Sequence, residues 1–77
     1  MHELGIAMEI AELAVERAGD AQIRRVVVEV GRLTAVFPDA LAFAWQAATI
    51  ESVLEGCVLE IVELPGDELR IRELEVM

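Results

Sequence analysis

Cysteine, histidine and basic side chains are scarce in this sequence, and each shortage excludes a class of site. The single cysteine, Cys57, cannot form a disulfide within the chain, which fits a reducing compartment. The single histidine, His2, has no second imidazole with which to build a metal or catalytic cluster. Six basic residues against fifteen acidic ones give a net charge of −9. Nucleic acids and anionic membrane surfaces bind basic patches, so we expect neither as a partner.

Targeting segments and catalytic motifs are also missing. The first twenty residues contain five acidic side chains in an amphipathic pattern, which argues against a secretory signal. No apolar run is long enough to span a membrane, so we predict a cytoplasmic protein. The sequence has no glycine-rich phosphate loop, and no nucleophile stands in a readable pattern with a base. Of the three functions that we consider for this sequence, an enzyme therefore has the least support.

What the sequence does have is enough apolar material for one core. Hydrophobic residues make up 56% of the 77 residues, so we expect a single domain over residues 1–77. The helical spacing of apolar side chains predicts a helix from Leu4 to Ala18, with glutamates on its solvent face. Gly19 is placed to end this helix in a left-handed conformation.

The middle of the chain predicts a strand followed by a second helix. Residues 23–31, "IRRVVVEVG", are rich in β-branched side chains that alternate, so one face of this strand is expected to meet water. A helix is predicted to begin near Pro38, a residue suited to the first turn, and to run through "DALAFAWQAA". This helix carries almost no charge after Asp39, so we expect it to be largely buried, with Trp45 in the core.

The last third of the sequence predicts two strands joined by a tight turn. Residues 57–64 and 68–76 alternate around "PGD", where Pro65 and Gly66 suit the centre of a type II turn. The apolar parity of the last strand changes midway, which predicts a β-bulge near Arg72 and Glu73. The expected fold is a two-layer α+β domain, two helices against a small three-stranded sheet, in the order helix–strand–helix–strand–strand. Its predicted core contains Ile10, Leu13, Val28, Leu41, Trp45, Leu59 and Ile61.

The first three residues, "MHE", form a candidate metal site because they lie at the chain's end. The Met1 amine, the His2 amide and the His2 imidazole can close small chelate rings on one ion, and the Glu3 amide can complete four nitrogens in a plane. Square-planar nitrogen ligation suits Ni(II) or Cu(II), whereas Zn(II) prefers a tetrahedron. From these residues alone, a flexible, solvated histidine is the competing interpretation.

Several stretches together resemble one family. They are "MHELGIAMEI", "VVVEVGRLTAVFPDALAFAWQ", "EGCVLEIVELP" and "ELRIRELEV", which extend from one end of the chain to the other. In this combination and order they resemble the HypA family, the nickel metallochaperones of nickel–iron hydrogenase maturation. The resemblance implies delivery of Ni(II), together with a HypB-like GTPase, to a hydrogenase large-subunit precursor, and in some organisms to urease.

The resemblance also implies a ligand set. The family's nickel site lies at the N-terminal amine, His2 and the adjoining backbone, so it is carried over here to Met1, His2 and Glu3. Asp39 lies in a family-like stretch and is carried over as a candidate further ligand. The chain is expected to be a monomer or a homodimer.

One departure from the family pattern is large. Family members insert a zinc ribbon with two Cys-x-x-Cys pairs between the last two strands, where this chain has only "PGD" at residues 65–67. A structural zinc site needs about four ligands, so no zinc is expected. Natural loss and removal in the laboratory both account for the missing ribbon. The second hypothesis follows from this loss: a metal-independent interaction module that docks to a maturation GTPase or a hydrogenase subunit.

Overall fold

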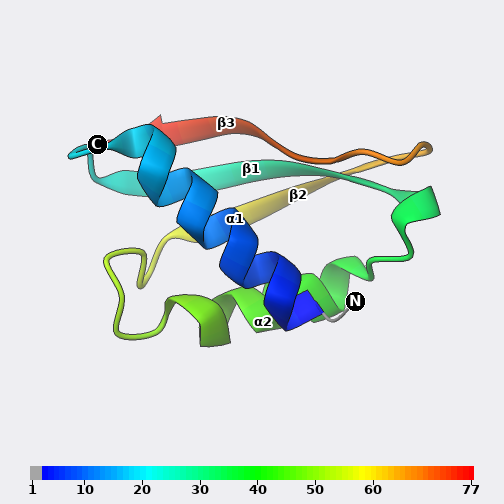
Figure 1. Ribbon diagram of the computed structural model, residues 1–77, viewed down its shortest axis with the longest axis horizontal. Helices are drawn as coiled ribbons and strands as arrows, with labels where there is room; N and C mark the ends of the chain where they lie inside the picture. The colour runs from blue at the N-terminus through cyan, green and yellow to red at the C-terminus, as the bar shows by residue number, and fades with distance from the viewer. Residues whose placement is uncertain (1–2) are drawn as a thin grey trace.

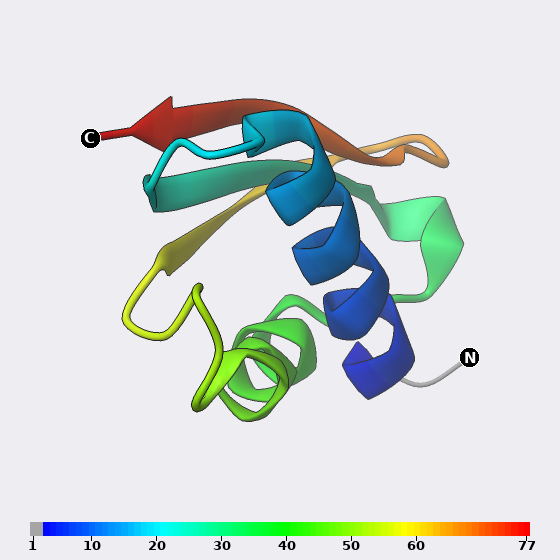
Figure 2. The ribbon, with the colours of Figure 1, turned by 60° about the vertical axis from the view of Figure 1, so that its left-hand side comes forward.

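The computed structural model describes residues 3–77, which form two layers. Two helices lie on the same face of a three-stranded sheet, while the other face of the sheet is not covered by a helix (Figures 1 and 2). The elements in chain order are α1 Glu3–Ala18, β1 Ile23–Gly31, the short 3-10 helix η1 Arg32–Thr34, α2 Pro38–Thr49, β2 Val58–Leu64 and β3 Leu69–Val76. This order confirms the predicted α+β fold, and η1 is the addition that the sequence patterns did not indicate.

Helix α1 packs through one narrow apolar face. Its buried residues are Ile6, Ala7, Ile10 and Ala14. The helix ends as predicted, because Gly19 has φ +61° and its N–H donates to the Val15 carbonyl at 3.1 Å. Placing Leu13 in the core was wrong, since Leu13 is 45% exposed. The small alanines let the backbone approach its neighbours closely, and Leu13 is left at the margin of the buried face.

The order of strands in the sheet is β2-β1-β3, so β1 is central. Strand β1 pairs parallel with β2 and antiparallel with β3, with Val28 opposite Ile61 on one side and Ile71 on the other. The expectation of a hairpin between the last two strands is therefore wrong, because they lie at opposite edges. The type II turn is wrong as well, since Gly66 is not among the glycines with positive φ.

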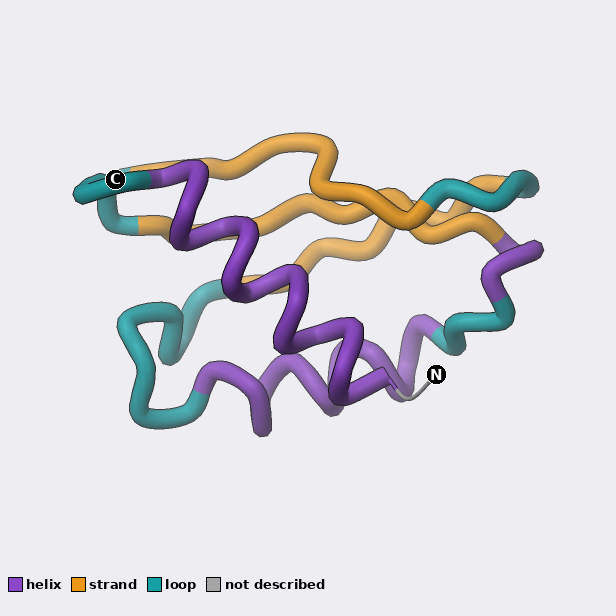
Figure 3. The backbone as a smooth tube through the Cα atoms, in the orientation of Figure 1, coloured by secondary structure: helices purple, strands orange, loops and turns teal. Residues whose placement is uncertain are grey.

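The link from β2 to β3 crosses over the end of β1. Figure 3 shows this loop at the end of the sheet beside η1, away from the C-terminus. The Gly31 N–H donates to the Glu68 carbonyl at 2.7 Å, and the Leu33 N–H donates to the Gly66 carbonyl at 2.9 Å. These two hydrogen bonds hold the crossing loop directly against the end of the central strand.

The predicted bulge in the last strand is confirmed. Val27 is opposite Glu73 while the next residue, Val28, is opposite Ile71, so Arg72 is the extra residue. Because the bulge switches the parity of β3, Ile71 before it and Leu74 after it both pack against the same core.

Strand β1 is buried on both faces, which corrects the expectation that one face meets water. Val27 is 3% exposed and Glu29 is 9% exposed on the face without helices. The Glu29 carboxylate accepts a hydrogen bond from Arg70 Nε at 2.6 Å and lies 3.4 Å from Arg72 Nε. The same hydrogen bond raises the pKa of Arg70 above its ordinary value. The arginine side chains of β3 thus contact the central strand on the face that has no helical layer.

Helix α2 is less buried than its apolar sequence predicts. Four of its residues are buried, namely Leu41, Ala44, Trp45 and Thr49. Phe43 is 76% exposed on the opposite side of the helix. The reason is that α2 is covered only on the side that meets α1 and the sheet. The core instead gains Leu54, which is 3% exposed and lies in the loop after α2.

Trp45 is a core residue, as predicted, and its indole also makes a buried hydrogen bond. Trp45 is 3% exposed and its Nε1 donates to the Cys57 carbonyl at 2.9 Å. We expect Trp45→Phe to lower the free energy of unfolding by about 2–4 kcal/mol, because it leaves a cavity and an unpaired buried carbonyl. Urea denaturation followed by circular dichroism measures this change. The exposed Phe43→Leu is the control and should change stability by less than about 0.5 kcal/mol. A loss below 1 kcal/mol for Trp45→Phe would contradict the assigned role of this hydrogen bond.

Candidate metal site at the start of the first helix

The predicted ligand residues are Met1, His2 and Glu3, which are consecutive in the sequence, and Asp39. Met1 and His2 are outside the residues that the structure describes. Glu3 is the first residue of α1, and Asp39 is an exposed residue in the first turn of α2. Of the four predicted ligand residues, the structure therefore describes Glu3 and Asp39.

A hydrogen bond joins the starts of the two helices. The Phe37 N–H donates to Glu3 Oε2 at 3.3 Å, and Phe37 is the residue that immediately precedes α2. Figure 1 shows the first turn of α1 beside the first turn of α2. The structure thus brings Glu3 and Asp39, which are 36 residues apart in sequence, to the same end of the molecule.

The position of Phe37 is set by a side-chain turn that the sequence analysis missed. Thr34 Oγ1 donates to the Gly31 carbonyl at 2.7 Å and accepts from the Val36 N–H at 3.2 Å. Between them Ala35 has the left-handed φ of 62°. A threonine three residues after a strand-ending glycine is a recognisable signal for such a turn. This turn directs the chain from the end of β1 to the start of α2.

Side chains of the described residues do not form a metal cluster by themselves. Across residues 3–77, no group of three or more His, Cys, Asp or Glu side chains is arranged to hold a metal ion. Glu3 and Asp39 would therefore need donors from outside that range. The donors that the sequence analysis named, the Met1 amine and the His2 nitrogens, are the ones immediately next to Glu3 in the chain.

Cys57 is not placed to act as a ligand. It is 9% exposed, and its Sγ donates to the Val58 carbonyl at 3.8 Å. Burial raises the pKa of this thiol, which keeps it protonated at neutral pH. Since thiolates rather than thiols bind metals, the expected absence of zinc is chemically consistent with this environment and stays a prediction.

Neither helix of residues 3–77 has the length and hydrophobicity needed to cross a bilayer.

Most of this chain matches one known protein family. The family model described as "Hydrogenase/urease nickel incorporation, metallochaperone, hypA" matches residues 1–69. The chain belongs to the HypA family. This confirms the resemblance noted in the sequence. A metallochaperone is not an enzyme, so the family also confirms that prediction.

Curated HypA relatives are similar over most of this chain but are longer than it is. The hydrogenase maturation factor HypA of Trichormus variabilis is 48% identical over 66 residues, which cover 86% of this chain and 58% of that protein. The hydrogenase maturation factor HypA of Geobacter metallireducens is 38% identical over 66 residues, covering 86% of this chain and 60% of the relative. This chain thus spans about 58–60% of the length of these two relatives.

A solved structure shows the same fold. The solution structure of the nickel metallochaperone HypA from Helicobacter pylori matches with a TM-score of 0.83 and 22% sequence identity. The match covers 100% of this chain and 98% of that one. At this identity the likeness supports the arrangement of helices and strands and nothing further.

Proposed function

We propose that residues 1–77 are the nickel-binding domain of a HypA-type metallochaperone that delivers Ni(II) during nickel–iron hydrogenase maturation. The observation that carries the proposal is the motif "MHE" in a chain that belongs to the HypA family, and Glu3, its third residue, is the first residue of α1. The Glu3–Phe37 hydrogen bond ties this terminus to the start of α2. The cargo is thereby held at one defined end of the domain.

The proposed ligands are the Met1 amine, the His2 amide and imidazole, and the Glu3 amide. Each deprotonated amide carries one negative charge, so two of them neutralise one Ni(II) ion. Charge neutrality matters here because the N-terminus of a helix is partly positive and repels a bare cation. The nitrogen of the first helical residue is also outside the i→i−4 hydrogen-bond ladder of α1. Asp39 is proposed as a further ligand at the same end of the molecule.

The missing zinc ribbon belongs to this proposal. The family match ends at Leu69, the first residue of β3, and residues 65–68 form the crossing loop. We propose that the ribbon insertion is absent near residues 65–67, with β3 completing the sheet directly after the short loop. The domain then keeps its nickel end and lacks the family's zinc module.

The proposed partners follow from the family. They are a HypB-like GTPase, which would act with this domain, and a hydrogenase large-subunit precursor, which would receive the nickel. The proposed location is the cytoplasm, and the chain is proposed to act as a monomer or homodimer. Neither nucleic acid nor a membrane is a proposed partner.

A metal-independent docking module is the second candidate function. It is favoured by large apolar side chains that stay exposed around the start of α2, where Leu33 is 76%, Phe37 70% and Phe43 76% exposed. A docking module needs neither a native N-terminal amine nor nickel. Titration with nickel therefore separates the two candidates.

The test is titration of the protein with its native N-terminus at several pH values. We expect one Ni(II) per chain and the d–d absorbance band of a square-planar site. The reference pKa values are about 8 for the amine and about 6.5 for the imidazole, and amide protons must also be released. Two amide protons alone imply that affinity falls about a hundredfold for each unit by which pH decreases between 8 and 6. Affinity that stays constant over this range would exclude the proposed ligands.

A further inference from the structure

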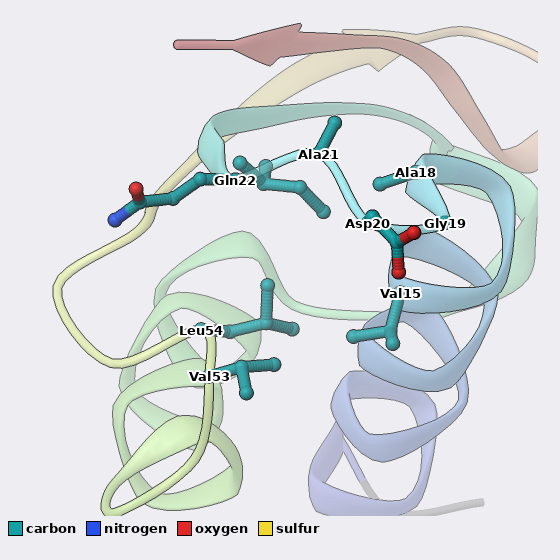
Figure 4. Close-up of a pocket in the computed structure, with 9 residues that line it drawn as sticks. Val15, Ala18, Gly19, Asp20, Ala21, Gln22, Val53 and Leu54 are labelled. Atoms are coloured by element: carbon teal, nitrogen blue, oxygen red, sulfur yellow. The ribbon is translucent and has the colours of Figure 1, made fainter.

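An apolar groove lies between the C-terminal half of α1 and the loop that follows α2. Two adjoining hollows of about 440 and 400 Å³ form it, and both are lined by Val15, Val53 and Leu54. Figure 4 shows Val15 of α1 on one wall, with Val53 and Leu54 facing it from the loop. Ala11, Ala18 and Ala48 extend the apolar lining.

The walls of this groove are exposed while its floor belongs to the core. Val53 is 81% exposed and Val15 is 39% exposed, whereas Leu54 is 3% exposed. An exposed valine at the tip of a loop contributes little to folding. A partner that covers it would gain the free energy of burying apolar surface, about 25 cal/mol per Å².

The α1 side of the groove carries three carboxylates. Glu12 and Glu16 line one hollow and Asp20 lines the other. Glu12 and Glu16 are four residues apart, so their positions along the axis of α1 are separated by about 6 Å. Asp20 lies in the turn directly after α1. Residues 3–20 and 38–56, which contain both helices, hold eight acidic residues and one arginine, a net charge of −7 out of the chain's −9.

These charges decide what can occupy the groove. A second copy of the chain docked through this surface would bring two acidic rows together, which costs free energy. A partner with Lys or Arg beside an apolar stripe would make both the apolar contact with the walls and ion pairs with the carboxylates. A helix presents side chains at the same four-residue spacing as the carboxylates and is the element that commonly docks its apolar face into such grooves.

We propose that the groove between α1 and residues 52–54 binds an amphipathic helix of a protein partner, with its apolar stripe on Val15 and Val53 and its basic flank on Glu12, Glu16 and Asp20. The inference depends on the fold and on these charges. It does not depend on the proposed nickel site, of which Glu3 is at the other end of α1.

The probe is a synthetic helical peptide of about 18 residues with a leucine stripe and arginines every fourth residue on one flank. Its twin carries glutamate in place of each arginine. Isothermal titration gives the affinity, and amide shifts of the isotope-labelled protein locate the contact. We expect the basic peptide to bind and to shift the amide resonances of residues 11–20 and 48–54. Its affinity should decrease as the salt concentration is raised, and the acidic twin should not bind.

Two matched pairs of variants test the apolar and the charged contacts separately. Val53→Asp should lower the affinity for the basic peptide at least about tenfold, even though the added negative charge strengthens nonspecific attraction to the peptide. Val58→Asp is its control, an exposed valine outside the groove with the same charge change. Glu12→Gln with Glu16→Gln should weaken binding and flatten its salt dependence more than Glu63→Gln with Glu73→Gln, which removes the same charge from the sheet.

Four results would overturn the proposal. They are no binding of the basic peptide, equal binding of the acidic twin, shifts confined to the sheet, and equal affinity for the Val53→Asp and Val58→Asp proteins. Dimerisation of the chain that Val53→Asp abolishes would assign the groove to a second copy and would also overturn it. Nickel titration of Val53→Asp should match the unaltered protein, so failure of the docking proposal and failure of the nickel proposal are seen in different measurements.

Discussion

Adding two residues ahead of Met1 is expected to abolish tight Ni(II) binding and to leave the domain folded. The extension converts the terminal amine into an amide and moves it away from the chain's end. Acetylating the Met1 amine or replacing His2 by Ala should have the same effect, because each removes one of the four proposed nitrogens. We expect loss of the square-planar absorbance band and an affinity reduced by at least about a thousandfold. Thermal unfolding with and without a chelator should be unchanged in all these proteins.

Position 3 offers a matched pair that separates backbone from side chain. Glu3→Ala and Glu3→Pro both remove the carboxylate that accepts from the Phe37 N–H. Only Glu3→Pro removes the backbone N–H, and proline is tolerated in the first turn of a helix, where α1 begins. We therefore expect Glu3→Ala to bind nickel nearly as well as the unaltered protein and Glu3→Pro to bind it poorly. Tight binding by the N-terminally extended protein would place the metal elsewhere.

Gly31→Ala is expected to destabilise the fold by about 3 kcal/mol or more. A Cβ at Gly31 would lie 2.1 Å from the Gly66 carbonyl oxygen and 2.7 Å from the Glu68 backbone nitrogen. Because these atoms belong to the backbone, the crossing loop itself would have to move away from β1. That movement would also break the hydrogen bonds from Gly31 to Glu68 and from Leu33 to Gly66.

Gly66→Ala is the matched control, since it adds the same methyl group from the other side of the contact. Its Cβ would lie 2.8 Å from Glu68 Oε1, the end of a flexible side chain that can rotate away. We expect a cost below about 1 kcal/mol. Urea denaturation of the two variants under the same conditions measures the difference. Equal losses of stability would show that the close approach of the loop to Gly31 is not what constrains this position.

Local patterns predicted the helices, the strands and the bulge. The spacing of apolar side chains in α1 and α2, the glycine after α1 and the proline at the start of α2 are local signals that act within a few residues. The change of apolar parity in β3 predicted the bulge at Arg72 because only an extra residue can keep both Ile71 and Leu74 on the core. The candidate metal site at Met1, His2 and Glu3 was also predicted from neighbours along the chain, and it stays a prediction.

The position of β3 in the sheet was not readable from its connection to β2. The Pro–Gly pair predicted a hairpin, yet residues 65–68 form a crossing loop over Gly31. The run "VVVEV" in β1 did contain a signal, because a nearly continuous apolar strand is typical of a central position buried on both faces. The two helices cover one face of that run, and on the other face the arginines of β3 neutralise Glu29.

By itself the sequence determined which segments become helix or strand, since this depends on neighbours along the chain. The tertiary structure decided the order of the strands, the exposure of Leu13 and Phe43 and the burial of Glu29. It also decided the contact between Glu3 and Phe37 and the groove at Val53. All of these depend on which segments, distant in sequence, cover one another when the whole apolar surface is buried.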